Sequence, residues 1–217
     1  MAISSLSRLG VPLSGNQSAS NQGLLMPKLA YRFRVLFQNF GVSKPTTELT
    51  KQVITAGRPQ PDFEQITLDV YNSRIKLAGK PKWNPITVKI RDDVNGSVSK
   101  LVGEQLQKQL DFMEQSSGAS GIDYKFSIGL QILDGGNGTN EPTVLEEWNI
   151  LGAYLKDVNY NAMDYNTSEA VKITLTITYD NAIQVNGAGT PTGVGQAIAY
   201  TVGTVATGAA SVNTNTV

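Results

Sequence analysis

The chain has 217 residues, which is long enough for one sizeable core with extensions. Its 18 basic and 18 acidic side chains cancel, so net charge gives no overall attraction to nucleic acid or to an anionic membrane. The absence of both Cys and His excludes disulfides, thiolate zinc sites and every catalytic triad that needs an imidazole. Only carboxylate or lysine chemistry remains, so we expect no enzyme, no cofactor and no metal site.

Charge is distributed unevenly along the chain. Before Lys28 the only charged side chain is Arg8, and after Asp180 there is none. The sequence therefore predicts an uncharged N-terminal arm (1–28), a charged body (29–184) and an uncharged C-terminal arm (185–217). The C-terminal arm contains the alternating stretch "AIAYTVGTVA", which would be an aggregation hazard if left loose. We therefore expect both arms to be ordered against neighbouring subunits.

Two kinds of targeting segment are not expected. The N-terminal stretch "MAISSLSRLGVPLSG" lacks the charged start and unbroken apolar run of a secretory signal. No apolar run approaches the length that spans a membrane, so we expect no membrane insertion by this chain.

The body is dominated by alternation of apolar and polar residues, which is typical of half-buried β-strands. The alternating runs are "YRFRVLF" (31–37), "QITLDVY" (65–71), "ITVKIRDD" (86–93), "DYKFSIGLQIL" (123–133) and "AVKITLTITYD" (170–180). Before the last run, "WNILGAYLKDVNY" indicates a strand that is bent or bulged around Gly152. Because each run has one polar face, we expect antiparallel sheets.

One segment follows helical spacing instead. In "SVSKLVGEQLQKQLDFMEQ" the apolar residues recur every three or four positions, which predicts a helix over about 97–115. Ser97 is the expected N-cap. Asp92 and Asp93 immediately precede this helix, where carboxylates complement the positive end of the helix dipole.

The polar stretch "DVNYNAMDYNTSE" partly matches a calcium-binding loop. Asp157, Asn159 and Asn161 occupy the first, third and fifth positions of an EF-hand. However, Ala162 stands where the turn glycine belongs, and Ser168 stands where the bidentate glutamate belongs. The sequence therefore favours a polar hairpin loop. The Gly-rich "DGGNGTNEP" (134–142) is not followed by a lysine or a helix, and it predicts a long hairpin connection.

Two further features have both a functional and an ordinary interpretation. Glu146 and Glu147 could form an acid/base pair with Asp92 or Asp93, although adjacent charges are more typical of a solvated face. The segment 43–65 contains three prolines and a glycine, so it is not expected to be a central strand throughout. It could be an ordinary surface excursion or a loop that contacts a partner.

The order of these elements resembles the tail tube protein of contractile-tailed bacteriophages, which is related to the tubes of type VI secretion and other contractile injection systems. The matching features are a strand "RVLFQ", a loop with Pro and Gly, "AG" at 78–79 followed by Trp83 and "ITVKIRDD", and then the helix. A "G…V…Y" strand and a final alternating strand ending in Tyr179 and Asp180 follow. The resemblance covers about Tyr31 to Asp180.

The resemblance implies a mainly β fold, an antiparallel β-sandwich or barrel with one packed α-helix. It also implies that six copies form a ring and that rings stack into the inner tail tube through which phage DNA passes. The implied partners are other copies, the tail sheath protein, and tape measure and baseplate or tail-terminator proteins, with DNA only in non-specific transit. The implied location is the virion tail, assembled in the host cytoplasm. Free sheet edges that pair head-to-tail with neighbours support ring formation independently.

Two sets of residues are predicted to serve this assembly. The polar row of the final strand is predicted to face the lumen: Lys172, Thr174, Thr176 and Thr178. Residues of the Pro-containing loop are predicted to stack rings, together with the arms: Thr55, Gly57, Arg58, Pro59, Gln60, Asp62 and Phe63.

Two other function classes remain open. One is a phage decoration or baseplate β-sandwich that binds virion proteins without polymerising. The other is a glycoside hydrolase that uses only Asp and Glu. The aromatic content of 7% with two Trp offers few sugar-binding platforms and argues against the hydrolase.

Overall fold

A computed structural model of the chain describes residues 27–43, 46–117, 124–135, 139–166 and 168–197. Most of both predicted arms, including nearly all of "AIAYTVGTVA", lies outside the described residues. The elements are β1 (Phe33–Gln38), α1 (Thr47–Gln52), β2 (Val53–Ala56), β3 (Gln60–Val70), β4 (Ser73–Asn84), β5 (Ile86–Arg91), α2 (Ser97–Gln109), β6 (Phe126–Leu133), β7 (Val144–Asn159), β8 (Lys172–Thr178) and β9 (Asn181–Asn186).

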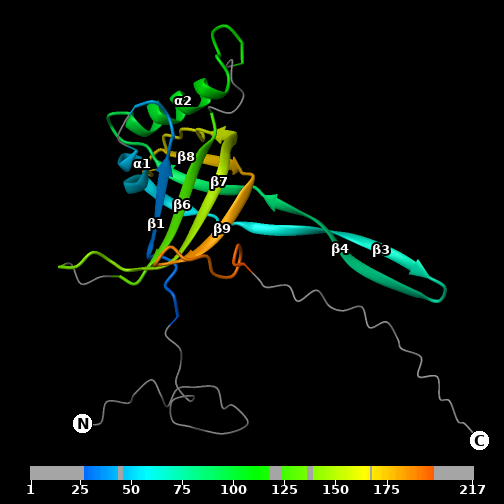
Figure 1. The fold of residues 1–217 in the computed structure, drawn as a ribbon. Coiled ribbons are helices and arrows are strands. Elements are labelled where there is room, and N and C mark those ends of the chain that lie inside the picture. The colour runs from blue at the N-terminus through cyan, green and yellow to red at the C-terminus, as the bar shows by residue number, and fades with distance from the viewer. Residues whose placement is uncertain (1–26, 44–45, 118–123, 136–138, 167, 198–217) are drawn as a thin grey trace, which may run out of the picture.

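Seven strands form one antiparallel sheet that folds over on itself. The strand order is β1-β6-β7-β8-β5-β2, with β9 beside the first part of β7, while β3 and β4 form a separate hairpin (Figure 1). The long strand β7 belongs to both parts of the sheet: up to Ala153 it pairs with β6 and β9, and from Tyr154 it pairs with β8. We call β1, β6, β9 and the start of β7 half A, and the end of β7 with β8, β5 and β2 half B.

The bend in β7 has a local cause. Gly152 has a φ of +66°, a conformation that glycine adopts without the steric penalty other residues meet. A Cβ at this position would collide with the carboxylate of Asp180. The register of β7 against β8 also shifts between Leu155 and Asp157. The bend that the sequence predicted around Gly152 is confirmed.

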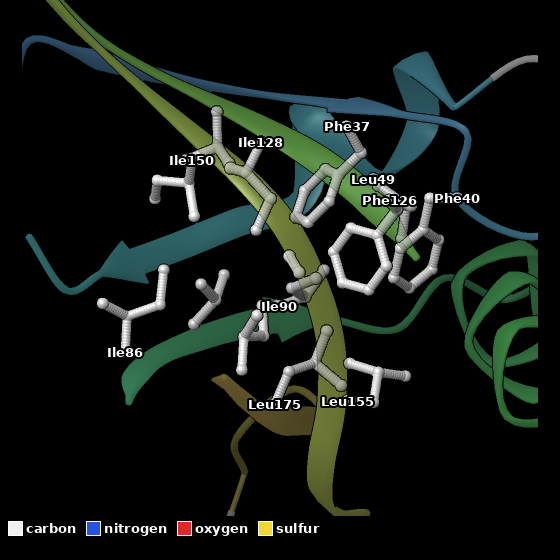
Figure 2. Close-up of a cluster of buried hydrophobic side chains, with 14 of the residues drawn as sticks. Phe37, Phe40, Leu49, Ile86, Ile90, Phe126, Ile128, Ile150, Leu155 and Leu175 are labelled. Atoms are coloured by element: carbon white, nitrogen blue, oxygen red, sulfur yellow. The ribbon is translucent and has the colours of Figure 1, made fainter. Parts of the chain in front are cut away.

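The core lies between the two halves. The apolar residues of β5 and β8 are buried with 4% exposure or less, and they face buried residues of β1, β6 and β7 (Figure 2). At the end next to the helices, Phe40 packs against Phe37 and Phe126, with ring centroids 5.3 and 4.9 Å apart. In these strands the apolar positions of the alternating sequence are therefore the side chains that enter the core.

Two predictions about the sheet need correction. The strand order begins at β1 and ends at β2, and these two strands do not pair in the described residues, so the fold is an open sandwich and no closed barrel. The segment read as a proline-punctuated excursion contains α1, β2 and the beginning of β3. The prolines are tolerated there because Pro59 lies between strands and Pro61 lies in a hairpin whose outer edges are unpaired in the described residues.

The helix α2 was predicted with two errors at its ends. Its N-cap is Gly96, with a φ of +65°, so Ser97 is the first residue of the helix and not its cap. The carboxylates of Asp93 and Asp92 accept the Ser97 and Ser99 N–H groups at 2.7 and 3.3 Å, so the expected role of the acid pair at this helix end is confirmed. Burial opposes ionisation of Asp93, but hydrogen bonds from Ser97 and Val98 outweigh it and lower its pKa.

The C-terminal end of α2 lies at Gln109, well before residue 115. Leu110 already has an extended conformation, with φ −150° and ψ 130°. Beyond it, the Asp111 carboxylate accepts the N–H groups of Met113 and Glu114 at 3.0 and 3.4 Å. Asp side chains that bond nearby backbone compete with helix formation. This competition explains why the helix ends at Gln109 although the apolar spacing of the sequence continues.

Glu104 of α2 ties the helix to the turn after β1. Its carboxylate accepts the Val42 and Ser43 N–H groups at 2.9 and 2.8 Å and the Ser43 hydroxyl at 2.6 Å. These hydrogen bonds, that of the Ser43 hydroxyl foremost, lower the pKa of Glu104 to about 2. The ionised carboxylate therefore stabilises the folded chain.

Replacing Gly152 by Ala should destabilise the protein by about 1–3 kcal/mol, because a Cβ is strained at positive φ and meets Asp180. Gly103→Ala is the matched control, since Gly103 lies inside α2 with open space around it. That change should stabilise the protein by up to about 1 kcal/mol. Urea unfolding monitored by circular dichroism measures both, and equal effects would contradict the bend argument.

The pH dependence of Glu104 gives a second prediction. Its pKa is lower in the folded chain, so its contribution is present above its ordinary pKa of 4.5 and is lost as pH falls toward about 2. Glu104→Gln should reduce the unfolding free energy at pH 7 by on the order of 2–3 kcal/mol. The difference from the wild type should shrink between pH 4.5 and 2 in urea titrations. A constant difference would show that the charge is not responsible.

Candidate functional site

The hairpin of β3 and β4 projects away from the body (Figure 1). Within the described residues its two strands pair only with each other. Every residue of β3 is exposed, as is most of β4. A two-stranded hairpin is marginally stable alone in water, so this one is a candidate for contact with another molecule.

The two faces of the hairpin differ in character. The register places Ile66 opposite Leu77 and Leu68 opposite Ile75, while Thr67 lies opposite Lys76 on the other face. Phe63 lies opposite Pro81, and the extra residue of the register shift that follows is on β4, so alternation along β3 places Phe63 on the same face as Thr67. We define the apolar hairpin face as these side chains, each 46–49% exposed: Ile66, Leu68, Val70, Ile75 and Leu77.

The tip of the hairpin carries a fully exposed aromatic residue. Tyr71 is 101% exposed and has a φ of +42°. Positive φ is unfavourable for a bulky residue and is found mainly at turns and functional sites. Tyrosine is also enriched among the residues that dominate binding energy at interfaces. The tip therefore adds an exposed aromatic residue to the apolar side chains of the hairpin.

The root of the hairpin is firmly attached to the body. Trp83 of β4 packs against Tyr179 with ring centroids 5.6 Å apart, and Pro59 is buried. Arg58, just before β3, donates from Nη2 to Glu146 Oε1 at 2.8 Å. The hairpin is thus held at its base while its outer part stays uncovered by its own chain.

Glu146 and Glu147 do not act as a pair. Glu146 points inward, is 5% exposed and also accepts the Trp148 indole N–H at 2.7 Å, whereas Glu147 points outward and accepts from Gln131. Asp92 and Asp93 are engaged at the start of α2. The acid/base arrangement considered from the sequence is therefore not assembled, because alternation sends adjacent residues of a strand to opposite faces.

The predicted ring-stacking residues surround the hairpin root. Thr55 lies in β2, Gly57 to Pro59 form the connection, and Gln60, Asp62 and Phe63 begin β3. Of these, Phe63 is a large apolar residue, and it is 56% exposed. The sequence predicts an ordinary strand at Ile66, Leu68 and Val70, since alternation does not show whether an apolar face meets the body or another molecule.

The predicted lumen residues lie on the outer face of half B. Lys172, Thr174, Thr176 and Thr178 are all half-buried, since β8 lies between β5 and β7. Asn161 donates to the Lys172 carbonyl at 2.6 Å and to the Thr174 hydroxyl at 3.4 Å. The β7–β8 connection is therefore hydrogen-bonded to this row of residues. Asp157 and Asn159 belong to β7 itself.

The outer face of half A carries a second polar row, which the sequence analysis missed. Arg34 Nε donates to Gln131 Oε1 at 2.9 Å, and Gln131 Nε2 donates to Glu147 Oε2 at 3.1 Å. The three residues are direct cross-strand neighbours on β1, β6 and β7. Their outward position follows from alternation, but their alignment depends on the pairing register.

A groove of about 820 Å³ lies at the open seam between β1 and β2. Its apolar lining includes Phe33, Val53 and Ile132. The charged residues among its described lining are all basic: Lys28, Arg32, Arg58 and Arg91. The seam thus combines two strand edges, an apolar floor and a positive rim.

The comparisons with known proteins concern the fold. No family model matches the sequence, and no curated protein matches it. A chain of the PVC sheath/tube terminator, from an extracellular contractile injection system in the extended state, matches with a TM-score of 0.55 and 15% identity over 75% of this chain and 99% of its own. A chain of the anti-feeding prophage tube-terminating cap gives a TM-score of 0.54 and 16% identity over 76% and 94%.

A chain of the PVC sheath–tube complex gives a TM-score of 0.52 and 14% identity over 79% of this chain and 99% of its own. These similar structures are components of contractile injection systems, and nearly the full length of each matched chain aligns with this chain. The resemblance inferred from the sequence is therefore confirmed as a likeness of fold. In the described residues, no helix is both long and apolar enough to cross a membrane.

Proposed function

We propose that this chain is a structural subunit of a contractile phage tail, whose copies self-assemble into stacked hexameric rings that form the inner tube for DNA. The observation that carries the proposal is the apolar hairpin face, which its own chain leaves uncovered in the described residues. The likeness to chains of sheath–tube and terminator assemblies supports the same role. On this proposal the protein acts by assembly and not by catalysis.

The energy of the hairpin contact explains why assembly would have to be cooperative. Burying the remaining half of each side chain on the apolar hairpin face contributes about 1 kcal/mol. The whole face therefore contributes roughly 5 kcal/mol, while association costs about 4–15 kcal/mol in lost freedom. One hairpin contact alone is weak. In a closed ring every copy both donates a hairpin and binds the hairpin of a neighbour. The contact that closes the ring therefore forms without a further loss of translational and rotational freedom.

The strand edges favour half A as the wall of the tube. A continuous ring of sheets needs edges that a neighbour can reach. The edge of β7 in half B is occupied at Leu155, whose N–H and C=O both bond the Gln109 side chain at 3.0 and 2.9 Å. In half A, β1 pairs with β6 alone among the described strands. We therefore propose the outer face of half A as the lumen surface, ahead of the β8 row predicted from the sequence.

The proposed partners follow from this position. Other copies bind above, below and beside each subunit, the sheath protein surrounds the tube, and tape measure and baseplate or terminator proteins meet its ends. DNA passes without specific contacts, the tube belongs to the virion, and assembly takes place in the host cytoplasm. A cap, decoration or baseplate component that forms at most one ring is the second candidate, since cap and baseplate assemblies are among the similar structures.

Replacing Ile66 and Leu77 together by Thr should abolish tubes while changing the unfolding free energy by less than about 1 kcal/mol, because both side chains are half-exposed. The matched control is Thr67→Ala with Lys76→Ala, the neighbouring cross-strand pair on the polar face. Negative-stain microscopy and sedimentation velocity report assembly. A wild-type protein that stays monomeric at high concentration would overturn the tube proposal. Single rings that never stack would support the cap or baseplate role.

Cysteine labelling can locate the lumen, because the native chain has no cysteine. Asn149→Cys lies on the outer face of half A, and Thr176→Cys lies on the outer face of half B. In assembled tubes we expect a bulky polymer-linked maleimide to modify Thr176→Cys and to leave Asn149→Cys unmodified, while both react in monomers. The reverse pattern would restore the β8 row as the lumen surface.

A further inference from the structure

Two segments far apart in the sequence meet at a single buried carboxylate. Lys28, the last residue of the N-terminal arm, and Arg58, which precedes the hairpin, both form ion pairs with Glu146. They lie 118 and 88 residues away from it in the sequence. Glu146 is 5% exposed and stands at the start of β7.

The local chemistry keeps Glu146 ionised. Burial raises its pKa, but hydrogen bonds from Lys28 and Trp148, together with the charges of Lys28 and Arg58, outweigh burial and hold the pKa below its ordinary value. The indole N–H of Trp148 fixes the same oxygen that Arg58 binds. The carboxylate is therefore held in one orientation from within the core while its two cations reach it from outside.

The exposure of the partners indicates what this cluster does. The side chains of Lys28 and Arg58 are 51% and 59% exposed, against 7% for Glu146. Removing the negative charge would leave no buried cation, because both partners can turn into water. Buried ion pairs contribute little net stability in general, and some instead specify one geometry. The cluster is thus better suited to fix directions than to hold the fold together.

We propose that Glu146 is a positioning residue for assembly: it fixes the direction in which the hairpin leaves the body and holds the end of the N-terminal arm. Through Arg58 it sets the angle of the apolar hairpin face, and through Lys28 it holds the last residue of the arm against the body. The angle between neighbouring copies would follow from both. The link to assembly rests on the proposed tube function, whereas the control of hairpin direction does not.

Hairpin direction can be measured without any assembly. Spin labels at Thr67→Cys on the hairpin and Lys100→Cys on α2, both exposed, report the distance between hairpin and body in dilute protein that carries the Ile66 and Leu77 substitutions to Thr. We expect a narrow distance distribution, broadened at least twofold by Glu146→Gln and by Arg58→Gln. Glu147→Gln, the outward neighbour, and Lys28→Gln should leave it unchanged, since neither touches the hairpin root.

Stability and assembly measurements complete the test. The Glu146→Gln variant should be folded in urea unfolding experiments, because Gln at 146 can still accept the Trp148 N–H. If this variant does not fold, the distance measurement on Arg58→Gln alone decides the proposal. In the otherwise native chain, Glu146→Gln should lower tube yield at fixed concentration at least tenfold. A distribution as narrow as that of the wild type in Arg58→Gln would overturn the positioning role. A native protein without tubes would instead overturn the tube proposal and leave the distance result standing.

Discussion

The physical constraint behind this structure is an apolar surface that its own chain does not cover. The 12 residues of β4 span roughly 40 Å, so the hairpin carries its apolar face well past the body (Figure 1). Trp83 against Tyr179 and Arg58 against Glu146 hold only its root. Exposed apolar patches of this kind mark interaction sites, and on the proposed function the partner is another copy of the chain. The marginal stability of an isolated hairpin then becomes tolerable, since a neighbour supplies the missing layer.

Most strand edges of the described chain are closed, which would protect the proposed assembly against disordered aggregation. Gln109 occupies the edge of β7 at Leu155. Residues 190–194 fold back on β9, where Gln184 bonds Val194 and Thr192 at 2.8 Å. These closures leave β1 and the hairpin as the unpaired edges of the larger strands in the described chain. Natural sheet proteins protect edges in this way against unwanted pairing, and here the protection also restricts where a neighbour can add.

Sequence reasoning identified β1, part of β3, β5, β6, β7 and β8, the bend at Gly152 and the helix α2, because each has a local signature, but it did not identify β2, β4 or β9. It failed where the answer depends on what a face touches. Ile66 and Leu68 alternate just as Ile173 and Leu175 do, yet the first two are exposed and the second two are buried. The helix end was misplaced because the Asp111 side chain competes for backbone N–H groups after Leu110. The pairing of Glu146 with Arg58 had no local signal, since 88 residues separate them.

The polar row on half A suits a wall that must let a polyanion move. Each Lys or Arg that grips a phosphate adds affinity that transit would have to undo. The Arg34 side chain is already engaged within the protein, because its Nε donates a hydrogen bond to Gln131. The amide of Gln131 in turn donates to the carboxylate of Glu147. The charges of the row cancel over neighbouring strands, so the surface stays wet and polar while offering phosphates little net attraction. On the proposed function, low net charge is therefore a property of the wall itself and not only of the whole chain, whose basic and acidic residues balance at 18 each.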